Sequence, residues 1–153
     1  MKKLLLVAHT PSANTKAMCD AVVRGAGHGD IDGVDVFAAS PFDVAAEQVL
    51  EAQAVILGTT ENLGYMSGAL KDFFDRIYYP CLEKTQGLPF AIYVRAGHDG
   101  TGTVRGIETI TTGLRWRSVR EPLVCKGEYS AEFEPQCEEL GMLMAAGLES
   151  GVF

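Results

Sequence analysis

A run of hydroxyl and amide side chains follows the first apolar segment of the chain, in the order His-Thr-Pro-Ser-Ala-Asn-Thr from His9 to Thr15. It leads into a predicted helix, whose unpaired N–H groups and positive dipole end favour an anion. The small residues Ser12 and Ala13 let the backbone approach a ligand. A dianionic phosphate needs such a donor-rich cradle, but the same residue types also cap ordinary helices. Phosphate binding and simple capping therefore both remain open.

A second segment, from Thr59 to Ser67, carries apolar and aromatic side chains where a loop should be polar. Leu63, Tyr65 and Met66 stand there between Gly64 and its neighbours. They could cover a planar aromatic ligand, or they could pack into the core or a dimer interface.

A third segment, from Ala96 to Thr103, contains Gly97, Gly100 and Gly102. Such glycine density indicates sharp bends or a close approach of the backbone to another group. Backbone groups here could bind the edge of a heterocycle. His98 is a possible ligand or proton relay, or an exposed loop histidine. His9 could pack near a phosphate or bond to the backbone.

Apolar periodicity predicts the elements that position these segments. The five expected strands are Lys2–Ala8, Gly33–Phe37, Ala54–Leu57, Pro89–Arg95 and Trp116–Leu123. The five expected helices are Asn14–Arg24, Val44–Glu51, Ser67–Tyr79, Val104–Thr112 and Ala131–Leu148. Ser12 or Asn14 is expected to cap the first helix and Ser67 the third. Pro80 should stop the third helix, and Gly113 should end the fourth.

Strictly alternating strands and helices predict an α/β fold. We expect one domain over residues 1–153, with a three-layer, doubly wound, parallel five-stranded sheet in the order 2-1-3-4-5. In such a sheet the ligand lies beyond the carboxyl ends of the strands, between strands 1 and 3. The three segments above should meet at that edge.

Composition narrows the functional classes. The chain carries 13 basic and 20 acidic residues, a net charge of −7, which argues against nucleic-acid binding. Acidity fits docking to basic partners or plain solubility. No apolar run approaches the roughly 20 residues of a membrane span, and the first apolar run is too short for a signal peptide, so we expect a cytoplasmic protein.

The four cysteines show neither metal-ligand spacing nor a disulfide framework. Cys19 and Cys137 fall on apolar helix faces, and we expect them to be buried packing residues. The phosphate-loop patterns G-x-x-x-x-G-K-[ST] and G-x-G-x-x-G are missing after the first strand.

The segment from Gly58 to Arg76, GTTENLGYMSGALKDFFDR, resembles the flavodoxin-like superfamily. The likeness is to short flavodoxin-family proteins and to FMN-dependent NAD(P)H:quinone reductases of the tryptophan-repressor-binding-protein type. In those proteins a G-T-P-T-type loop precedes G-x-M-S and a K-x-F-x-D-R helix. The matching positions are Gly58, Thr59, Gly64, Met66, Ser67, Lys71, Phe74, Asp75 and Arg76.

The resemblance implies a flavodoxin-like domain that binds FMN across the three segments. The implied phosphate contacts are Thr10, Ser12, Asn14 and Thr15, with His9 beside them. The implied neighbours of the isoalloxazine ring are Thr59, Thr60, Glu61, Asn62, Leu63 and Gly64. The implied contacts of its pyrimidine edge are Ala96, Gly97, His98 and Gly100.

Three functions follow as alternatives. The first is an oxidoreductase that accepts hydride from NAD(P)H and reduces a quinone or similar acceptor, as the Gly58–Arg76 match favours. The second is a single-electron carrier between proteins, as the acidic charge favours. The third is a flavin-free binding protein of the same fold. A homodimer is compatible with each. We further hypothesise that Glu61 near the ring disfavours an anionic reduced flavin and lowers its potential.

Overall fold

The computed structural model describes residues 1–153. The apolar runs in Lys2–Ala8, Ala54–Asn62 and Pro89–Ala96 form the three central strands of one sheet. The strands are β1 (Lys2–Ala8), β2 (Val34–Ala39), β3 (Ala54–Asn62), β4 (Tyr65–Met66), β5 (Pro89–Ala96), β6 (Arg117–Ser118) and β7 (Leu123–Lys126). The helices are α1 (Ala13–Ala26), α2 (Ala46–Glu51), α3 (Gly68–Cys81), α4 (Thr101–Gly113) and α5 (Phe133–Ser150), with a short 3₁₀ turn at Pro41–Asp43.

The sheet order is β2-β1-β3-β5-β6, with every pair along this path parallel. β7 also pairs in parallel with β5, and β4 forms an antiparallel hairpin with β3. The fifth position of the sheet is therefore shared by β6 and β7. The predicted 2-1-3-4-5 doubly wound order is confirmed.

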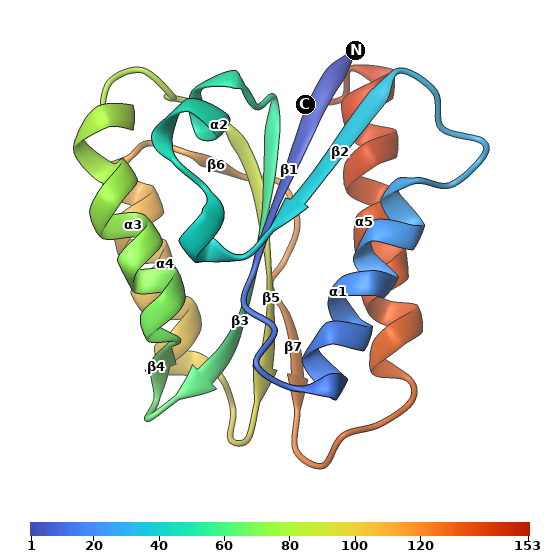
Figure 1. Cartoon of the computed structure of the whole chain (residues 1–153), viewed down its shortest axis with the longest axis vertical. Helices are drawn as coiled ribbons and strands as arrows, with labels where there is room; N and C mark the ends of the chain where they lie inside the picture. The colour runs from blue at the N-terminus through green and yellow to red at the C-terminus, as the bar shows by residue number, and fades with distance from the viewer.

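Helices cover both faces of the sheet, as Figure 1 shows, with α1 and α5 on one side and α2, α3 and α4 on the other. One core cluster includes Phe73 and Ile77 of α3 and Val94 of β5. The other includes Met18 of α1 and Cys137 of α5. Alternate residues of each central strand feed these two clusters, because successive side chains of a strand point to opposite faces.

Two strand predictions need correction. β3 continues past Gly58 to Asn62, so four residues expected in a loop belong to a strand. Gly58 does not end the strand: its Cα faces the ring of Tyr93, where a Cβ would lie 2.3 Å from Cζ. The predicted strand Trp116–Leu123 is broken in two, and its main part, β7, lies mostly beyond that range.

Helix boundaries also differ from prediction, by one or two residues in α1, α2 and α5 and more notably in α3 and α4. Pro80 lies inside the last turn of α3, which ends one residue later at Cys81. α4 begins at Thr101, three residues earlier than expected, and Gly113 is its last residue, with Leu114 as the cap. The predicted caps Ser12 and Ser67 are confirmed, and Asn14 lies within α1.

All four cysteines are free thiols. Cys137 is fully buried as predicted, whereas Cys19 is only partly buried because it lies at the margin of the α1 packing face. None of the helices combines the length and hydropathy of a membrane span.

Candidate functional site

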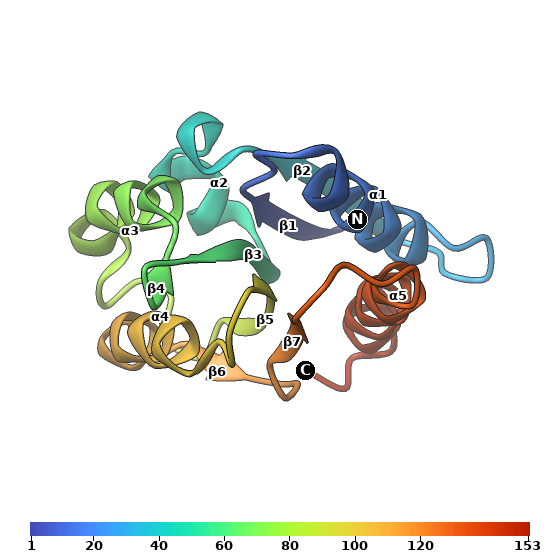
Figure 2. The same cartoon turned by 90° about the horizontal axis from the view of Figure 1, so that it is seen from below.

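The carboxyl ends of β1, β3, β5 and β7 form one edge of the molecule, which Figure 2 views directly. The chain leaves this edge through three connections: the β1–α1 loop, the β3–β4 hairpin and the β5–α4 loop. The first is joined to β3 because the His9 N–H donates to the Gly58 carbonyl, 3.0 Å away. The structure thus brings the three predicted segments to one edge.

Ser12 and Thr15 close the start of α1 through a reciprocal capping box. The Thr15 N–H donates to Ser12 Oγ at 3.2 Å, and the Ser12 N–H donates to Thr15 Oγ1 at 3.0 Å. The Thr15 hydroxyl donates to the Ser12 carbonyl at 3.0 Å. Thr15 is buried and its hydroxyl hydrogen is used inside the cap, so its role here is to shape the loop.

Unused donors remain at the same helix start. The N–H groups of Ala13 and Asn14 have no protein acceptor. The Thr10 hydroxyl and the Asn14 amide side chain make no hydrogen bond within the protein, and Asn14 is exposed. Lys16 faces solvent, and its Nζ pairs with Asp20 Oδ1 at 2.5 Å. An anion at this point would be held by N–H dipoles and hydroxyls rather than by a cation.

His9 leads from β1 into this loop and is partly buried. Its Nδ1 atom is buried without a hydrogen-bond partner. Desolvation lowers the pKa of the His9 imidazole, which favours the neutral ring. An unpartnered polar atom beside unused donors marks the loop as an incomplete polar site.

The β3–β4 hairpin turns through Leu63 and Gly64, whose φ angles are 53° and 77°. Positive φ at both central residues is typical of a type I′ hairpin turn, in which Asn, Asp or Gly usually takes the first place. Leu63 therefore holds a strained backbone conformation, and its side chain is fully exposed at the tip. The Leu63 side chain is therefore available for contact with a ligand bound at this edge.

Thr59 fixes the base of the hairpin. Its buried Oγ1 accepts from the Ser67 N–H at 3.0 Å and donates to the Thr60 carbonyl at 2.9 Å. Thr60 donates to the Asn62 side chain at 2.8 Å. These hydroxyls are engaged inside the hairpin, and they position it against the start of α3.

Glu61 joins the hairpin to the β5–α4 loop. Its Oε1 accepts from the His98 N–H at 2.8 Å and its Oε2 accepts from the Gly100 N–H at 2.9 Å. Asp99, between them, accepts from the Thr101 N–H at 3.0 Å, and this hydrogen bond holds the pKa of the Asp99 carboxyl below its ordinary value. The loop is thus shaped by two carboxylates.

Backbone packing also joins the hairpin to α4. A Cβ on Gly102 would lie 2.0 Å from the Gly64 carbonyl oxygen, and one on Gly106 would lie 2.3 Å from the Tyr65 ring. Only glycine permits contact this close. The second and third segments therefore form one connected unit.

Comparisons with known proteins show which proteins this chain is similar to. No family model matches the chain. A flavodoxin of Aquifex aeolicus (strain VF5) is 28% identical over 114 residues, which is 74% of this chain but only 60% of that protein's length. A flavodoxin from the domain Archaea superposes with a TM-score of 0.80 at 23% identity, covering 95% of this chain and 98% of the other.

A flavodoxin described as WrbA-like, from Agrobacterium tumefaciens, superposes with a TM-score of 0.74 at 17% identity, over 98% of this chain and 99% of the other. The two-electron reduced flavodoxin of Megasphaera elsdenii also gives 0.74 at 17% identity, over 94% and 98% of the two chains. The chain has the flavodoxin-like fold. The flavodoxin-like fold that the resemblance implied is confirmed, and the sequence likeness to a flavodoxin agrees with it.

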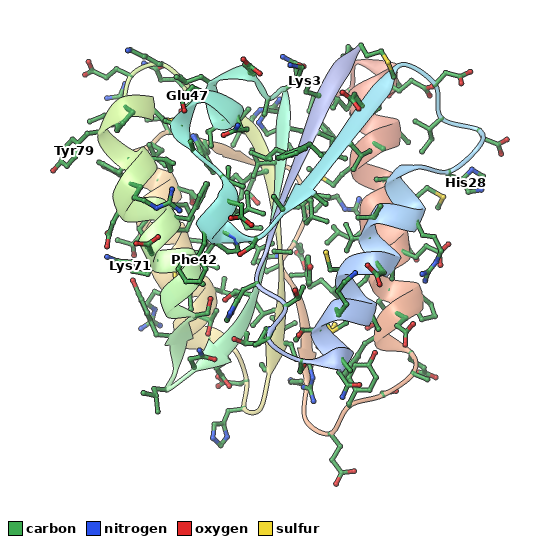
Figure 3. The ribbon with its side chains drawn as sticks, in the orientation of Figure 1. Lys3, His28, Phe42, Glu47, Lys71 and Tyr79 are labelled. Carbon is green, nitrogen blue, oxygen red and sulfur yellow. The ribbon has the colours of Figure 1, made fainter.

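Within this flavodoxin-like fold, the predicted site residues divide into two groups. Exposed or partly exposed at the edge are His9, Thr10, Ser12, Asn14, Thr60, Glu61, Asn62, Leu63, Gly64, Gly97 and His98. Buried beneath it are Thr15, Thr59, Ala96 and Gly100. The Ala96 carbonyl already accepts from the Gly127 N–H and from Arg95. His28 projects from the loop after α1, away from the edge (Figure 3).

The predicted site residues do not include Ala13 or Asp99, whose N–H groups are also free donors at this edge. Neither N–H group makes a hydrogen bond within the protein. The Ala13 donor follows from the Ser12 cap, because the first N–H groups of any helix lack partners. Asp99 carries no such signal, since only the folded loop shows which of its N–H groups are used.

Sequence reasoning also missed Arg95, at the end of β5. Its guanidinium donates to the carbonyls of Ala96 at 2.9 Å and Cys125 at 3.1 Å. It lies over the rings of Tyr129 and Phe133, 5.7 and 5.3 Å from their centroids. No carboxylate lies within ion-pair distance of it, so a cation without an ionic partner flanks the edge.

Proposed function

We propose that this chain binds FMN at the carboxyl edge and works as a flavodoxin-type electron-transfer protein. The observation that carries the proposal is the set of unused donors at the start of α1. The free N–H groups of Ala13 and Asn14, with the Thr10 hydroxyl, suit a phosphate by number and by chemistry. The glycine-rich β5–α4 loop and the β3–β4 hairpin lie at the same edge of the sheet.

The residues divide the work of binding. The α1 start and its Ser12–Thr15 cap hold the phosphate. The β3–β4 hairpin and the β5–α4 loop flank the ring, and the exposed Leu63 supplies apolar cover. FMN supplies the one- and two-electron chemistry, while the protein binds, orients and partly excludes water.

Paired titrations with FMN and riboflavin test this proposal, because the two differ only in the phosphate. Thr10→Val and Asn14→Ala each remove one side-chain donor. Each variant should weaken FMN binding about tenfold, since a hydrogen bond to a charged group contributes about 1.5–3 kcal/mol. Riboflavin affinity should not change. Thr112→Val, an exposed threonine on α4, is the matched control. Wild-type protein that quenches no FMN fluorescence would refute the proposal.

We propose NAD(P)H-dependent reduction of a quinone as a second candidate. It is supported by the likeness of the Gly58–Arg76 segment and by the superposition on the WrbA-like protein over nearly the whole chain. Anaerobic stopped-flow mixing of the FMN-loaded protein with NADPH separates the two candidates. Rapid two-electron reduction that a quinone then reverses supports the reductase. Reduction by dithionite but not by NADPH supports the carrier.

A further inference from the structure

We propose that Glu61 is a positioning residue that holds the β5–α4 loop in its ligand-binding shape, leaving the N–H groups of Gly97 and Asp99 as the donors that face the ring. This inference rests on the proposed FMN function. It starts from the pair of hydrogen bonds that Glu61 accepts from His98 and Gly100, at 2.8 and 2.9 Å.

The carboxylate of Glu61 is well suited to this task. An ionised carboxylate only accepts hydrogen bonds, and each of its oxygens here takes one N–H. No Lys, Arg or His lies within ion-pair distance of Glu61, so these two donors are its direct compensation. Hydrogen bonds to a charged acceptor are the stronger kind. Glu61 therefore has no competing partner that would draw it away from the loop.

The loop needs such a partner because its sequence is flexible. Gly97, Gly100 and Gly102 lie within six residues, and glycine loses more conformational freedom on folding than other residues. Gly100 has a φ of 71° and lies against Val124, where a Cβ would meet Cγ1 at 2.8 Å. Packing thus fixes the end of the loop, and Glu61 fixes its middle against the hairpin.

Because Glu61 takes two N–H groups of the β5–α4 loop, only the remaining N–H groups of that loop can donate to a ligand. His98 and Gly100 donate to Glu61, so they are not free for the carbonyl oxygens of a pyrimidine edge. The N–H groups of Gly97 and Asp99 have no protein acceptor, and both residues are exposed. A ligand edge that presents acceptor oxygens suits these two donors. This reassigns the implied ring contact from His98 and Gly100 to their neighbours.

Amide exchange in the ligand-free protein tests the positioning role without any flavin. Glu61→Gln keeps the shape but offers only one acceptor oxygen, so exchange at the His98 and Gly100 amides should accelerate about tenfold or more. Glu61→Asp keeps the charge on a shorter side chain and should give an intermediate rate. Glu128→Gln removes an exposed carboxylate of the β7–α5 loop that has no partner and is the control. Unchanged exchange, or equal acceleration at all amides, overturns the positioning role.

Flavin titrations test the assignment of the ring-side donors. Glu61→Gln should weaken FMN and riboflavin binding by the same factor, about tenfold, because the phosphate cradle is untouched. The ratio of the two affinities should stay at its wild-type value. Tighter binding by the variant would show that the carboxylate merely occupies donors that the ring takes, and would overturn the assignment. If the wild type binds neither flavin, the proposed function and the ring-side assignment fail together, while amide exchange still decides whether Glu61 holds the loop.

Discussion

Ser12 and Asn14 lie two positions apart yet do different work. The Ser12 hydroxyl belongs to the capping box, whereas the Asn14 side chain makes no bond within the protein. Ser12→Ala should therefore lower the free energy of unfolding by about 1 kcal/mol, as measured by urea denaturation. Asn14→Ala should leave stability nearly unchanged and weaken FMN binding. Equal effects of the two variants on stability would contradict this division.

His9 should make stability depend on pH. Desolvation lowers its pKa in the folded protein, so the unfolded chain binds a proton more readily. Well above the ordinary histidine pKa, His9 is uncharged in both the folded and the unfolded protein and does not change the free energy of unfolding. As the pH falls below that pKa, the unfolded chain takes up the proton first, so stability is lost. His9→Gln should reduce that loss in urea titrations between about pH 7 and 5.

Histidine NMR resonances give the matching site measurement. The His9 resonance should titrate below the ordinary histidine range, and added FMN should move its pKa upward if the phosphate dianion lies beside it. The exposed His28, which lies away from the edge, serves as the internal control. If the His9 pKa is the same with and without FMN, the phosphate does not lie beside His9.

At the scale of elements, α1 depends on α5 through small residues. A Cβ on Gly25 would lie 1.8 Å from the Glu138 carbonyl oxygen, and one on Gly141 would lie 2.1 Å from that of Val22. Gly25→Ala should force the helices apart and lower the free energy of unfolding by about 1–3 kcal/mol. Gly68→Ala, on α3 with open space around it, is the control and should be neutral or stabilising. Equal stability of the two variants would refute the close contact.

The elements that sequence predicted best are those that packing and local pattern both favour. β1 and β5 read as apolar runs because both of their faces are buried. β3 was cut short because Gly58 resembles a strand end, whereas its real reason is the Tyr93 ring. The predicted strand Trp116–Leu123 was wrong for a different reason. β6 and β7 are short, so neither has enough residues to show a period.

Sequence predicted that the three segments meet at one edge, but it could not predict which of their individual atoms are already hydrogen-bonded. Residue types located the three segments at one edge, because topology brings the ends of parallel strands together. Composition could not show that Thr59 bonds inside the hairpin or that Glu61 binds main-chain donors. Both depend on which groups from distant parts of the chain fall within hydrogen-bond reach.

At the scale of the whole molecule, the charge of −7 should govern encounters with protein partners. Electron transfer from the reduced, FMN-loaded protein to a basic cytochrome should slow as ionic strength rises, because salt screens the attraction. Transfer to a small neutral quinone should change little and is the control. Stopped-flow rates between about 10 mM and 0.5 M salt measure both. A rate to the cytochrome that is independent of salt would argue against docking through the acidic surface.

The contact between α1 and α5 also has a consequence for how the protein is made. The proposed phosphate cradle is complete in sequence by Thr15, yet the helix behind it has only 14 residues and takes much of its support from α5, which the ribosome adds well after α1. A nascent chain that has not yet exposed α5 should hold α1 only loosely against the sheet. Under the proposed function, cofactor capture then waits until α5 has been made and docks against α1.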